Sequence, residues 1–199
     1  IVPRDAKSRL LRKLLAQYHG AILLFSRTKH NARKITRAIR DMGYRVAEIH
    51  SDRSLAQRRE ALEGFKTGKY RVLIATDIAA RGIDVTGIEL VINYDLPDDA
   101  ENYVHRIGRT GRAGHKGHAI SFATPDQESE VRSIEKLVRV ALPVAEHPEL
   151  PPEKFDSFAS APRRGFGVQG GHRSGGGGGG HKRRSFGART FGKPRRSSR

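Results

Sequence analysis

Residues 21–42 read AILLFSRTKHNARKITRAIRDM, and the fold is decided by the change of pattern within this stretch. Ala21–Phe25 is a short apolar run, suited to a buried strand. The polar corner Ser26-Arg27-Thr28 follows, and Lys29–Met42 then reads as a helix that Gly43 is well placed to end. The stretch therefore predicts a buried strand that leads directly into a helix.

The same alternation continues through the first 140 residues. Further helices are expected over 6–18, 55–66, 98–106 and 127–139, and further strands over 45–49, 71–75, 90–94 and 118–123. Ser54 and Gln57 form a capping box before the helix at 55–66, and Gly68 stops that helix. Strands and helices in this order predict an α/β fold with a mostly parallel sheet covered on both faces.

Polar clusters follow three of the expected strands. They lie at residues 26–28, 50–53 and 76–77. In parallel sheets of this kind, ligands bind beyond the carboxyl ends of the strands. We therefore expect a ligand site where these clusters meet.

The composition favours a polyanionic partner, with nucleic acid as the first candidate and an anionic membrane surface as the second. Lysine and arginine number 38 against 21 acidic residues, which gives a formal charge of +17. No cysteine is present, which excludes disulfides and cysteine-ligated metal sites and fits a reducing cytoplasm. The longest apolar runs are far shorter than the roughly 20 residues that span a bilayer, so no transmembrane segment is expected.

The charge is concentrated in the last part of the chain. Residues 157–199 contain 11 lysines and arginines, no acidic residue and 12 of the 22 glycines. We expect a disordered tail there, joined by a linker at 146–156, because so little apolar surface cannot offset the entropy of ordering. Three phenylalanines in the tail are each followed by glycine: Phe166, Phe186 and Phe191. Base stacking and phosphate attraction predict RNA binding by the tail, and a solubilising linker is the alternative.

Residues 103–114, YVHRIGRTGRAG, contain arginines at every third position. Glycines between them prevent a long helix and allow the backbone to come close to a ligand. Guanidinium groups fit phosphate oxygens and stay charged at any working pH. A solvated, basic helix end is the ordinary alternative for an arginine-rich stretch.

The segment His105–Arg112 resembles motif VI of the DEAD-box ATP-dependent RNA helicases. The resemblance implies that Arg109 and Arg112 are arginine fingers, which reach the γ-phosphate of ATP held by the other motor domain. It also implies that His105 and Arg106 couple the nucleotide site to the rest of the motor, as cofactor-binding residues. A finger supplied across a domain gap accelerates phosphoryl transfer by about 10³ to 10⁵ in other nucleotidases.

Residues 75–85, ATDIAARGIDV, resemble motif V of the same family. The resemblance places Thr76 and Asp77 at the RNA backbone, and Gly82 and Asp84 at the nucleotide. In this assignment the Asp84 carboxylate accepts a hydrogen bond from the ribose. Taken alone, Asp84 would instead be interpreted as a carboxylate that caps a loop.

Two earlier segments complete the resemblance. Leu23–Lys29 is similar to motif IV, which implies that Arg27 contacts RNA, and residues 50–65 are similar to motif IVa, which implies the same for Arg53 and Arg58. Two departures stand out in the latter segment: the family has glycine at position 51 and glutamine at position 55, where this chain has serine and leucine. These departures put a close backbone approach and a glutamine contact in doubt.

The resemblance covers about residues 1–145 and implies a RecA-like three-layer αβα sandwich, most like the bacterial RhlE-type group. The chain has no Gly-x-x-x-x-Gly-Lys-Ser/Thr loop and no Asp-Glu-Ala-Asp stretch. We therefore expect the triphosphate cradle and the Mg²⁺ ligands on a separate N-terminal RecA-like domain, no metal ligand here, and no ATP hydrolysis by this piece alone.

The interpretation is the C-terminal motor half of an ATP-dependent RNA helicase, which uses ATP with Mg²⁺ and binds RNA with little sequence specificity. Two alternatives remain open. One is a non-enzymatic RNA-binding or annealing protein, and the other is a DNA translocase of the same superfamily. Histidine at position 105 favours the RNA group, because related branches often carry glutamine there.

Overall fold

The computed structural model describes residues 1–80, 83–111, 117–145 and 154–155. All of them belong to one compact unit, Ile1–Pro162. The expected tail at 157–199 and most of the expected linker lie outside the described residues, so both stay predictions. The strands are β1 (Ala21–Phe25), β2 (Val46–Ile49), β3 (Val72–Ala75), β4 (Ile88–Asn93) and β5 (His118–Ser121). The helices are α1 (Lys7–Gln17), α2 (Lys29–Asp41), α3 (Leu55–Lys66), α4 (Asp77–Ala80), α5 (Ala100–Ile107) and α6 (Glu128–Val138).

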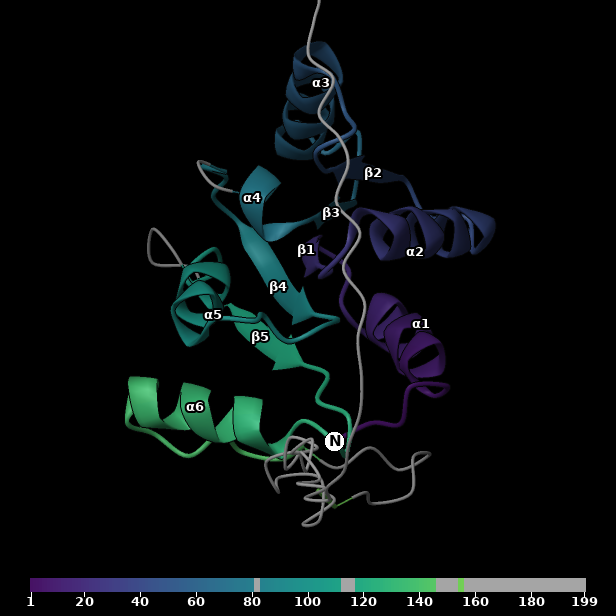
Figure 1. Cartoon of the computed structure of the whole chain (residues 1–199). Coiled ribbons are helices and arrows are strands. Elements are labelled where there is room, and N and C mark those ends of the chain that lie inside the picture. The colour runs from purple at the N-terminus through teal and green to yellow at the C-terminus, as the bar shows by residue number, and fades with distance from the viewer. Residues whose placement is uncertain (81–82, 112–116, 146–153, 156–199) are drawn as a thin grey trace, which may run out of the picture. The chain divides into compact units, whose positions relative to one another are not determined.

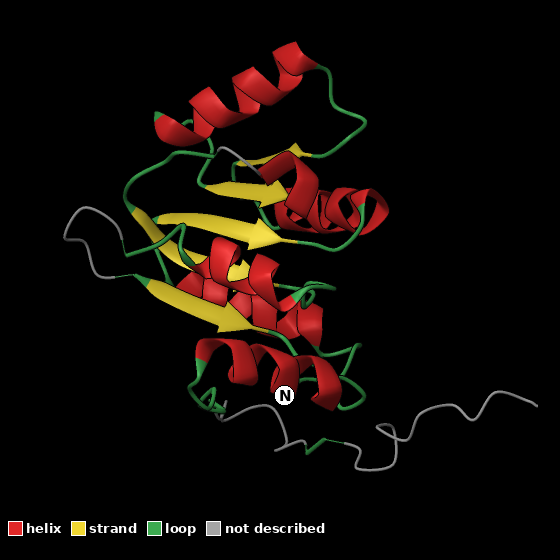
Figure 2. Cartoon of the chain, turned by 60° about the vertical axis from the view of Figure 1, so that its left-hand side comes forward, coloured by secondary structure: helices red, strands yellow, loops and turns green. Residues whose placement is uncertain are grey.

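The strands form a single sheet in the order β2-β3-β1-β4-β5, and every neighbouring pair is parallel. The central strand β1 pairs on one side with β3, where Ile22 lies opposite Val72, and on the other side with β4, where Ile22 lies opposite Leu90. Figure 2 shows the strands pointing the same way between layers of helices. The predicted parallel sheet is confirmed.

Two hydrophobic cores lie on opposite faces of this sheet. From β1, Ile22 and Leu24 join the core under α1 and α2, whereas Leu23 and Phe25 join the core under α3 and α4. All four side chains are almost completely buried. A strand covered on both faces must be apolar at every position, which explains the unbroken run that the sequence shows.

The remaining helices pack on each other around a third, smaller core. Tyr103 of α5 and Ile134 of α6 meet there with Leu96 and Ala123, which follow β4 and β5. Figure 1 shows α6 beyond α5, while α1 and α2 lie together on the other side of the strands. The arrangement is a three-layer αβα sandwich.

Local signals in the sequence set the helix ends as expected. Ser54 and Gln57 make both hydrogen bonds of the capping box at the start of α3. Gly43 and Gly68, which follow α2 and α3, have φ angles of +85° and +77°, in the left-handed region that favours glycine. Thr28 caps α2 by accepting a hydrogen bond from the Asn31 N–H at 3.1 Å.

The structure differs from the sequence prediction in its shortest elements. Helix α4 was not predicted, because a single turn of four residues is too short to show helical periodicity. Strand β4 starts two residues before the expected 90, and β5 ends two residues before the expected 123. Within the described ranges, no helix is both long and apolar enough to cross a membrane.

Candidate nucleotide and RNA site

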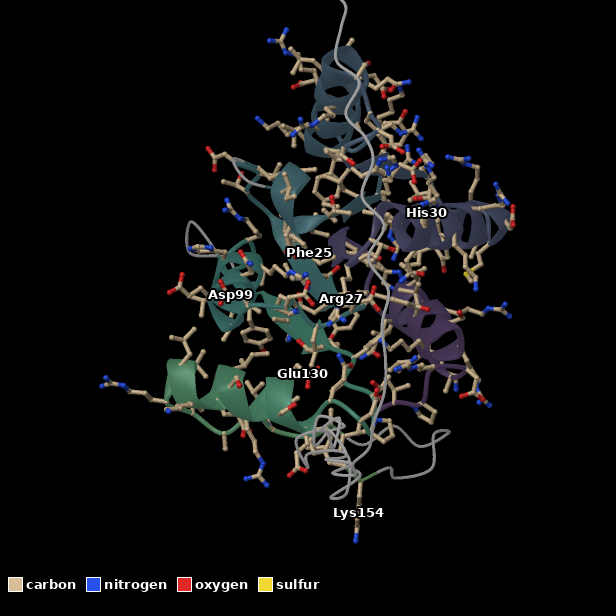
Figure 3. All side chains as sticks on the ribbon, viewed as in Figure 1. Phe25, Arg27, His30, Asp99, Glu130 and Lys154 are labelled. Carbon is tan, nitrogen blue, oxygen red and sulfur yellow. The ribbon has the colours of Figure 1, made fainter. Side chains whose placement is uncertain are left out.

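The polar segments after β1, β2 and β3 lie at one edge of the sheet, as expected. Parallel strands bring Ser26 and Arg27 after β1, the loop 50–53 after β2, and Thr76 and Asp77 after β3 to their common carboxyl ends. Figure 3 shows Phe25 and Arg27 in the middle of the molecule, where this edge meets the helices.

Arg106 is the most buried charged residue here, with 2% of its surface exposed. Its Nε and Nη2 donate to the two carboxylate oxygens of Asp77 at 2.6 and 2.7 Å. Its Nη1 donates to Asn93 Oδ1 at 3.2 Å and to the Asp95 carbonyl at 2.7 Å, and the guanidinium lies 5.0 Å from the centre of the Phe25 ring. One side chain thus joins α5 to α4, β4 and β1.

In this geometry Arg106 and Asp77 bind each other within the domain. Both were expected to contact ligands, Arg106 at the nucleotide and Asp77 at RNA. Within the domain, a two-point ion pair occupies both carboxylate oxygens of Asp77 and two nitrogens of the Arg106 guanidinium, and ligand contact by either residue stays a prediction. The pair holds the segment after β3 against α5, and so fixes where the neighbouring residues of both motifs lie.

An open hollow of about 300 Å³ lies beside this pair. It is lined by residues of α4, α5 and the strand end: Phe25, Asp77, Ala80, Asp99, Glu101, Asn102, His105, Arg106 and Arg109. Three of the predicted motif VI residues therefore share one surface. A hollow of this size is at the small end for ligand pockets, as expected for half of a site.

Arg109 follows the end of α5 and turns toward the motif V segment. Its Nη1 donates to the Ile83 carbonyl at 2.6 Å, directly before Asp84, which is exposed. The turn is fixed on its other side by Thr110, whose hydroxyl donates to the Ile88 carbonyl at 2.5 Å. Arg109 and Asp84 are thereby brought to neighbouring segments.

Close approach of the chain at Gly117 supports this turn. A Cβ atom at Gly117 would lie 1.9 Å from the Thr110 hydroxyl and 2.4 Å from the Gly111 nitrogen. Only glycine leaves room for residues 110–111 to pack there. Two further predicted residues, Gly82 and Arg112, lie outside the described residues.

Arg27 is anchored at the carboxyl end of β1. Its Nε lies 3.2 Å from Asp98 Oδ1, and its Nη2 donates to the Leu96 carbonyl at 3.1 Å. The side chain remains 40% exposed. These bonds hold the guanidinium at the surface with donors still open to a ligand.

Asp95 organises the base of this corner, and it was not predicted. Its carboxylate accepts hydrogen bonds from the Arg27 N–H at 3.1 Å, the Ser26 hydroxyl at 3.1 Å, Asn31 Nδ2 at 2.8 Å and Lys7 Nζ at 3.3 Å. Burial raises the pKa of Asp95, but the Arg27 N–H, the Lys7 ammonium and the other donors together hold that pKa below its usual value.

Arg53 is tethered by a second buried carboxylate, Glu48 on β2. The Arg53 guanidinium pairs with Glu48, whose other oxygen accepts from the Thr36 hydroxyl of α2 at 2.9 Å. Burial raises the pKa of Glu48, but the bonds from Arg53 and Thr36 outweigh it and lower the pKa overall. Arg53 Nε is buried and has no hydrogen-bond partner among the described residues, and its side chain is 34% exposed.

His50 lies in the same cluster and is fully buried. Its Nδ1 accepts from the Asp52 N–H at 3.3 Å, and its Nε2, which has no hydrogen bond within the described part of the chain, lies 3.6 Å from Glu48 Oε1. Burial lowers the pKa of His50 and outweighs the opposing effect of Glu48. A neutral imidazole therefore supports the loop that carries Arg53.

The last two predicted RNA residues flank α4. Arg58 of α3 reaches across to the Ala79 carbonyl at 3.5 Å, a weak hydrogen bond by its length. The Thr76 carbonyl accepts from the N–H groups of Ala79 and Ala80 at 3.0 and 2.9 Å, which starts α4. Arg58 and Thr76 thus meet at the same short helix.

Residues 6–114 match the model of the helicase conserved C-terminal domain. The chain belongs to this family. The helicase domain is 43% identical over 154 residues to the ATP-dependent RNA helicase DeaD of Klebsiella pneumoniae, which covers 76% of this chain and 24% of the relative. This chain therefore spans about a quarter of the length of that relative.

Solved structures agree with this assignment. The helicase domain superposes on the chain of the Escherichia coli DEAD-box protein SrmB solved bound to regulator of ribonuclease activity A. The TM-score is 0.72 with 30% identity, over 77% of this chain and 91% of that solved chain. On Saccharomyces cerevisiae Dbp5 bound to RNA and ADP BeF3, the TM-score is 0.61 with 33% identity, over 69% of this chain and 36% of Dbp5. The fold is that of the RecA-like domains of DEAD-box proteins.

Sequence reasoning missed the two carboxylates that organise the helicase domain's arginines. For Glu48 a signal existed, because it is the single charged residue in the otherwise apolar strand β2. For Asp95 no local signal existed, because its partner Lys7 is 88 residues away in the chain. Arg27 and Arg53 pair with Asp98 and Glu48, which the sequence did not single out, whereas the partner of Arg106, Asp77, was among the predicted site residues.

Proposed function

We propose that this helicase domain is the C-terminal motor half of an ATP-dependent RNA helicase, which couples ATP binding and hydrolysis to local unwinding of RNA duplexes. The observation that carries the proposal is the Arg106–Asp77 ion pair. It joins the segment that begins with Thr76 to the helix that leads to Arg109, so one buried contact links the proposed RNA and nucleotide sides. Relatives that are named ATP-dependent RNA helicases support the proposal.

On the nucleotide side, the residues fit one half of an ATP site. Arg109 has one nitrogen on the Ile83 carbonyl and keeps further donors for phosphate oxygens, and the exposed Asp84 carboxylate can accept from a ribose hydroxyl. Arg109 and Arg112 would stabilise the negative charge that develops on the γ-phosphate, and His105 and Gly82 would also take part in nucleotide binding. ATP supplies the phosphoanhydride bond, and its Mg²⁺ would be held by residues of an N-terminal RecA-like domain.

On the RNA side, Arg27, Arg53, Arg58 and Thr76 would hold the backbone at the carboxyl edge of the sheet. Guanidinium and hydroxyl donors of this kind bind phosphate without reading bases, so low sequence specificity follows. Asp77 would act indirectly, by keeping α4 in place for Thr76. Bending of the bound strand between the two motor domains would then open a short duplex.

The wider organisation of the protein is part of the same proposal. Residues 1–145 form the motor domain, 146–156 a linker and 157–199 a basic RNA-binding tail. The intact protein is placed in the cytoplasm, and its subgroup is proposed to be RhlE-type on the sequence features at Ile49-His50, 65–68 and 134–137.

The test uses the intact protein with the separate substitutions Arg109→Ala and Arg112→Ala. Loss of a finger should lower RNA-stimulated ATP turnover by about 10³-fold or more while RNA affinity changes little. Arg132→Ala on α6, an exposed arginine paired with Glu128, is the matched control and should leave turnover unchanged. Unchanged turnover in both finger variants would refute the proposal, and RNA annealing without any ATP hydrolysis would support the non-enzymatic alternative.

A further inference from the structure

Basic residues are distributed very unevenly over the helices of this domain. Helices α1 and α2 carry nine lysines and arginines and a single acidic residue, Asp41. Helices α3, α5 and α6 together carry six basic and six acidic residues. The motor domain's excess of positive charge therefore lies on the one face of the sheet that α1 and α2 cover.

Most of this charge is exposed and unneutralised. Five side chains on the two helices are exposed and have no acidic partner anywhere in the described ranges: Arg9, Arg12, Lys34, Arg37 and Arg40. On α3 and α6 the exposed basic residues are fewer and mixed with acidic ones, and Arg132 of α6 pairs with Glu128. We call the five side chains the basic face.

The arrangement is unfavourable for the fold itself. Arg33 and Arg37 are four residues apart in α2, and like charges at this spacing repel and destabilise a helix. Asp52 relieves part of the repulsion by pairing with Lys29 and Arg33 at 2.9 and 2.7 Å. Among the described residues, no ion pair neutralises Lys34, Arg37 or Arg40, and Asp41 at the end of α2 is the one acidic residue of that helix.

The basic face continues into the proposed RNA site. An open groove of about 480 Å³ runs between α1 and α2, and its lining includes Lys34 at one side and Arg27 at the carboxyl end of β1. Figure 1 shows the two helices side by side. A strand that leaves Arg27 therefore has a basic path along α2, which is about 20 Å long.

The chemistry of the basic face selects a nucleic acid over other anionic partners. All large apolar side chains that are exposed in the described residues lie on other elements, at Leu55, Ile78, Val104, Leu137, Val140 and Val144. A protein partner or a membrane would need apolar contacts of that kind on the same face. Arginines without apolar neighbours suit a phosphate backbone.

We propose that the basic face is a second RNA-binding surface, which holds the backbone of RNA that extends beyond the motor site. The proposal rests on the proposed function, because it takes the polyanion to be the helicase substrate. It adds to that function a contact with flanking RNA that does not take part in ATP hydrolysis.

The test uses the intact protein with Lys34→Gln, Arg37→Gln and Arg40→Gln combined. Arg59→Gln, Lys66→Gln and Lys136→Gln combined, all exposed on α3 and α6, is the control that removes equal charge elsewhere. Affinity is measured against salt for a long RNA and for an oligonucleotide just long enough to stimulate ATP hydrolysis. For the long RNA, the salt slope should fall by about 2 and the affinity by roughly tenfold at low salt, at about 0.7 of slope for each lost phosphate contact.

The control variant should match the unmodified protein, and turnover at saturating RNA should be unchanged in both. Equal affinities of variant and control for the long RNA would overturn the proposal. The proposal would also be overturned if the variant lost as much affinity for the short oligonucleotide as for the long RNA. The same holds if the variant bound RNA normally but no longer bound an acidic protein partner. Absence of RNA-stimulated hydrolysis in the unmodified protein would instead count against the proposed function, and the affinity comparison would still decide this one.

Discussion

Arg106 and Arg53 are both paired with a carboxylate at the edge of the sheet, but they differ in how much of each guanidinium is used. Arg106 is 2% exposed and donates to Asp77, Asn93 and the Asp95 carbonyl. Arg53 is held by Glu48 alone, and its Nε has no partner among the described residues. Four of the five N–H donors of Arg106 are engaged within the domain, whereas Arg53 keeps more of its donors open to a ligand.

Breaking the Arg106–Asp77 ion pair should have the largest effect on the free energy of unfolding. Arg106→Leu leaves the Asp77 carboxylate without its partner at a partly buried position, so the free energy of unfolding should fall by about 3–5 kcal/mol. Urea unfolding of the intact protein, followed by circular dichroism, measures this. Arg132→Leu removes an exposed ion pair on α6 and should cost less than about 1 kcal/mol. Similar losses in the two variants would mean that Arg106 does not join the elements as described.

Weakening the Arg53–Glu48 pair should lower the free energy of unfolding less than the loss of Arg106 does, but it should also lower the affinity for RNA. Glu48→Gln removes the charge that holds Arg53 and turns an amide toward Thr36, which should cost about 1–3 kcal/mol of unfolding free energy. RNA affinity should fall at the same time, because Arg53 loses its fixed position.

The matched control is Glu60→Gln on α3, an exposed carboxylate paired with Lys69. It should leave both stability and RNA affinity nearly unchanged. Positioning of Arg53 by Glu48 is wrong if Glu48→Gln lowers stability but binds RNA with unaltered affinity and salt slope.

The smallest effect concerns pH and Asp95, which supports the Arg27 corner. Its pKa is below the ordinary value of 3.8 in the folded state, so the unfolded state binds the proton first as the pH falls. The stability that Asp95 contributes is present at neutral pH and is lost as the pH falls below about 3.8 toward the folded-state pKa. Asp95→Asn should therefore be less stable than the unmodified protein at pH 7, and the difference should shrink in acid.

Unfolding free energies at pH 7 and pH 3 give this comparison. Asp98→Asn is the control, because the Asp98 side chain is 80% exposed and its one ion pair within the described part of the chain is with Arg27. A gap between Asp95→Asn and the unmodified protein that stays constant with pH would contradict the assignment of the shift to Asp95.

Much of the fold followed from local sequence signals. The apolar run of β1, the capping box at Ser54 and the glycines after α2 and α3 each act over a few residues, and the structure bears them out. The position of the candidate site also followed, because parallel strands bring the polar corners that follow them to one edge. Helix α4 could not be predicted, since one turn has no period to detect.

The sequence could not show which arginine of the motif is buried and which lies at the surface. Arg106 and Arg109 belong to one regular motif, three residues apart. Helix α5 ends at Ile107, so Arg106 is carried inward on the helix while Arg109 lies on the turn that follows. Where the chain leaves the helix decides which arginine is buried, and that depends on contacts such as Thr110 with Ile88 that are distant in the sequence.

The contacts of Arg106 also determine how this domain can move. They tie α4, α5 and the ends of β1 and β4 together, so these elements behave as one rigid body. Thr76 starts α4 and Arg109 follows α5, and neither can shift independently while the ion pair is intact. A displacement of one of these segments would therefore carry the other with it, through the single side chain of Arg106.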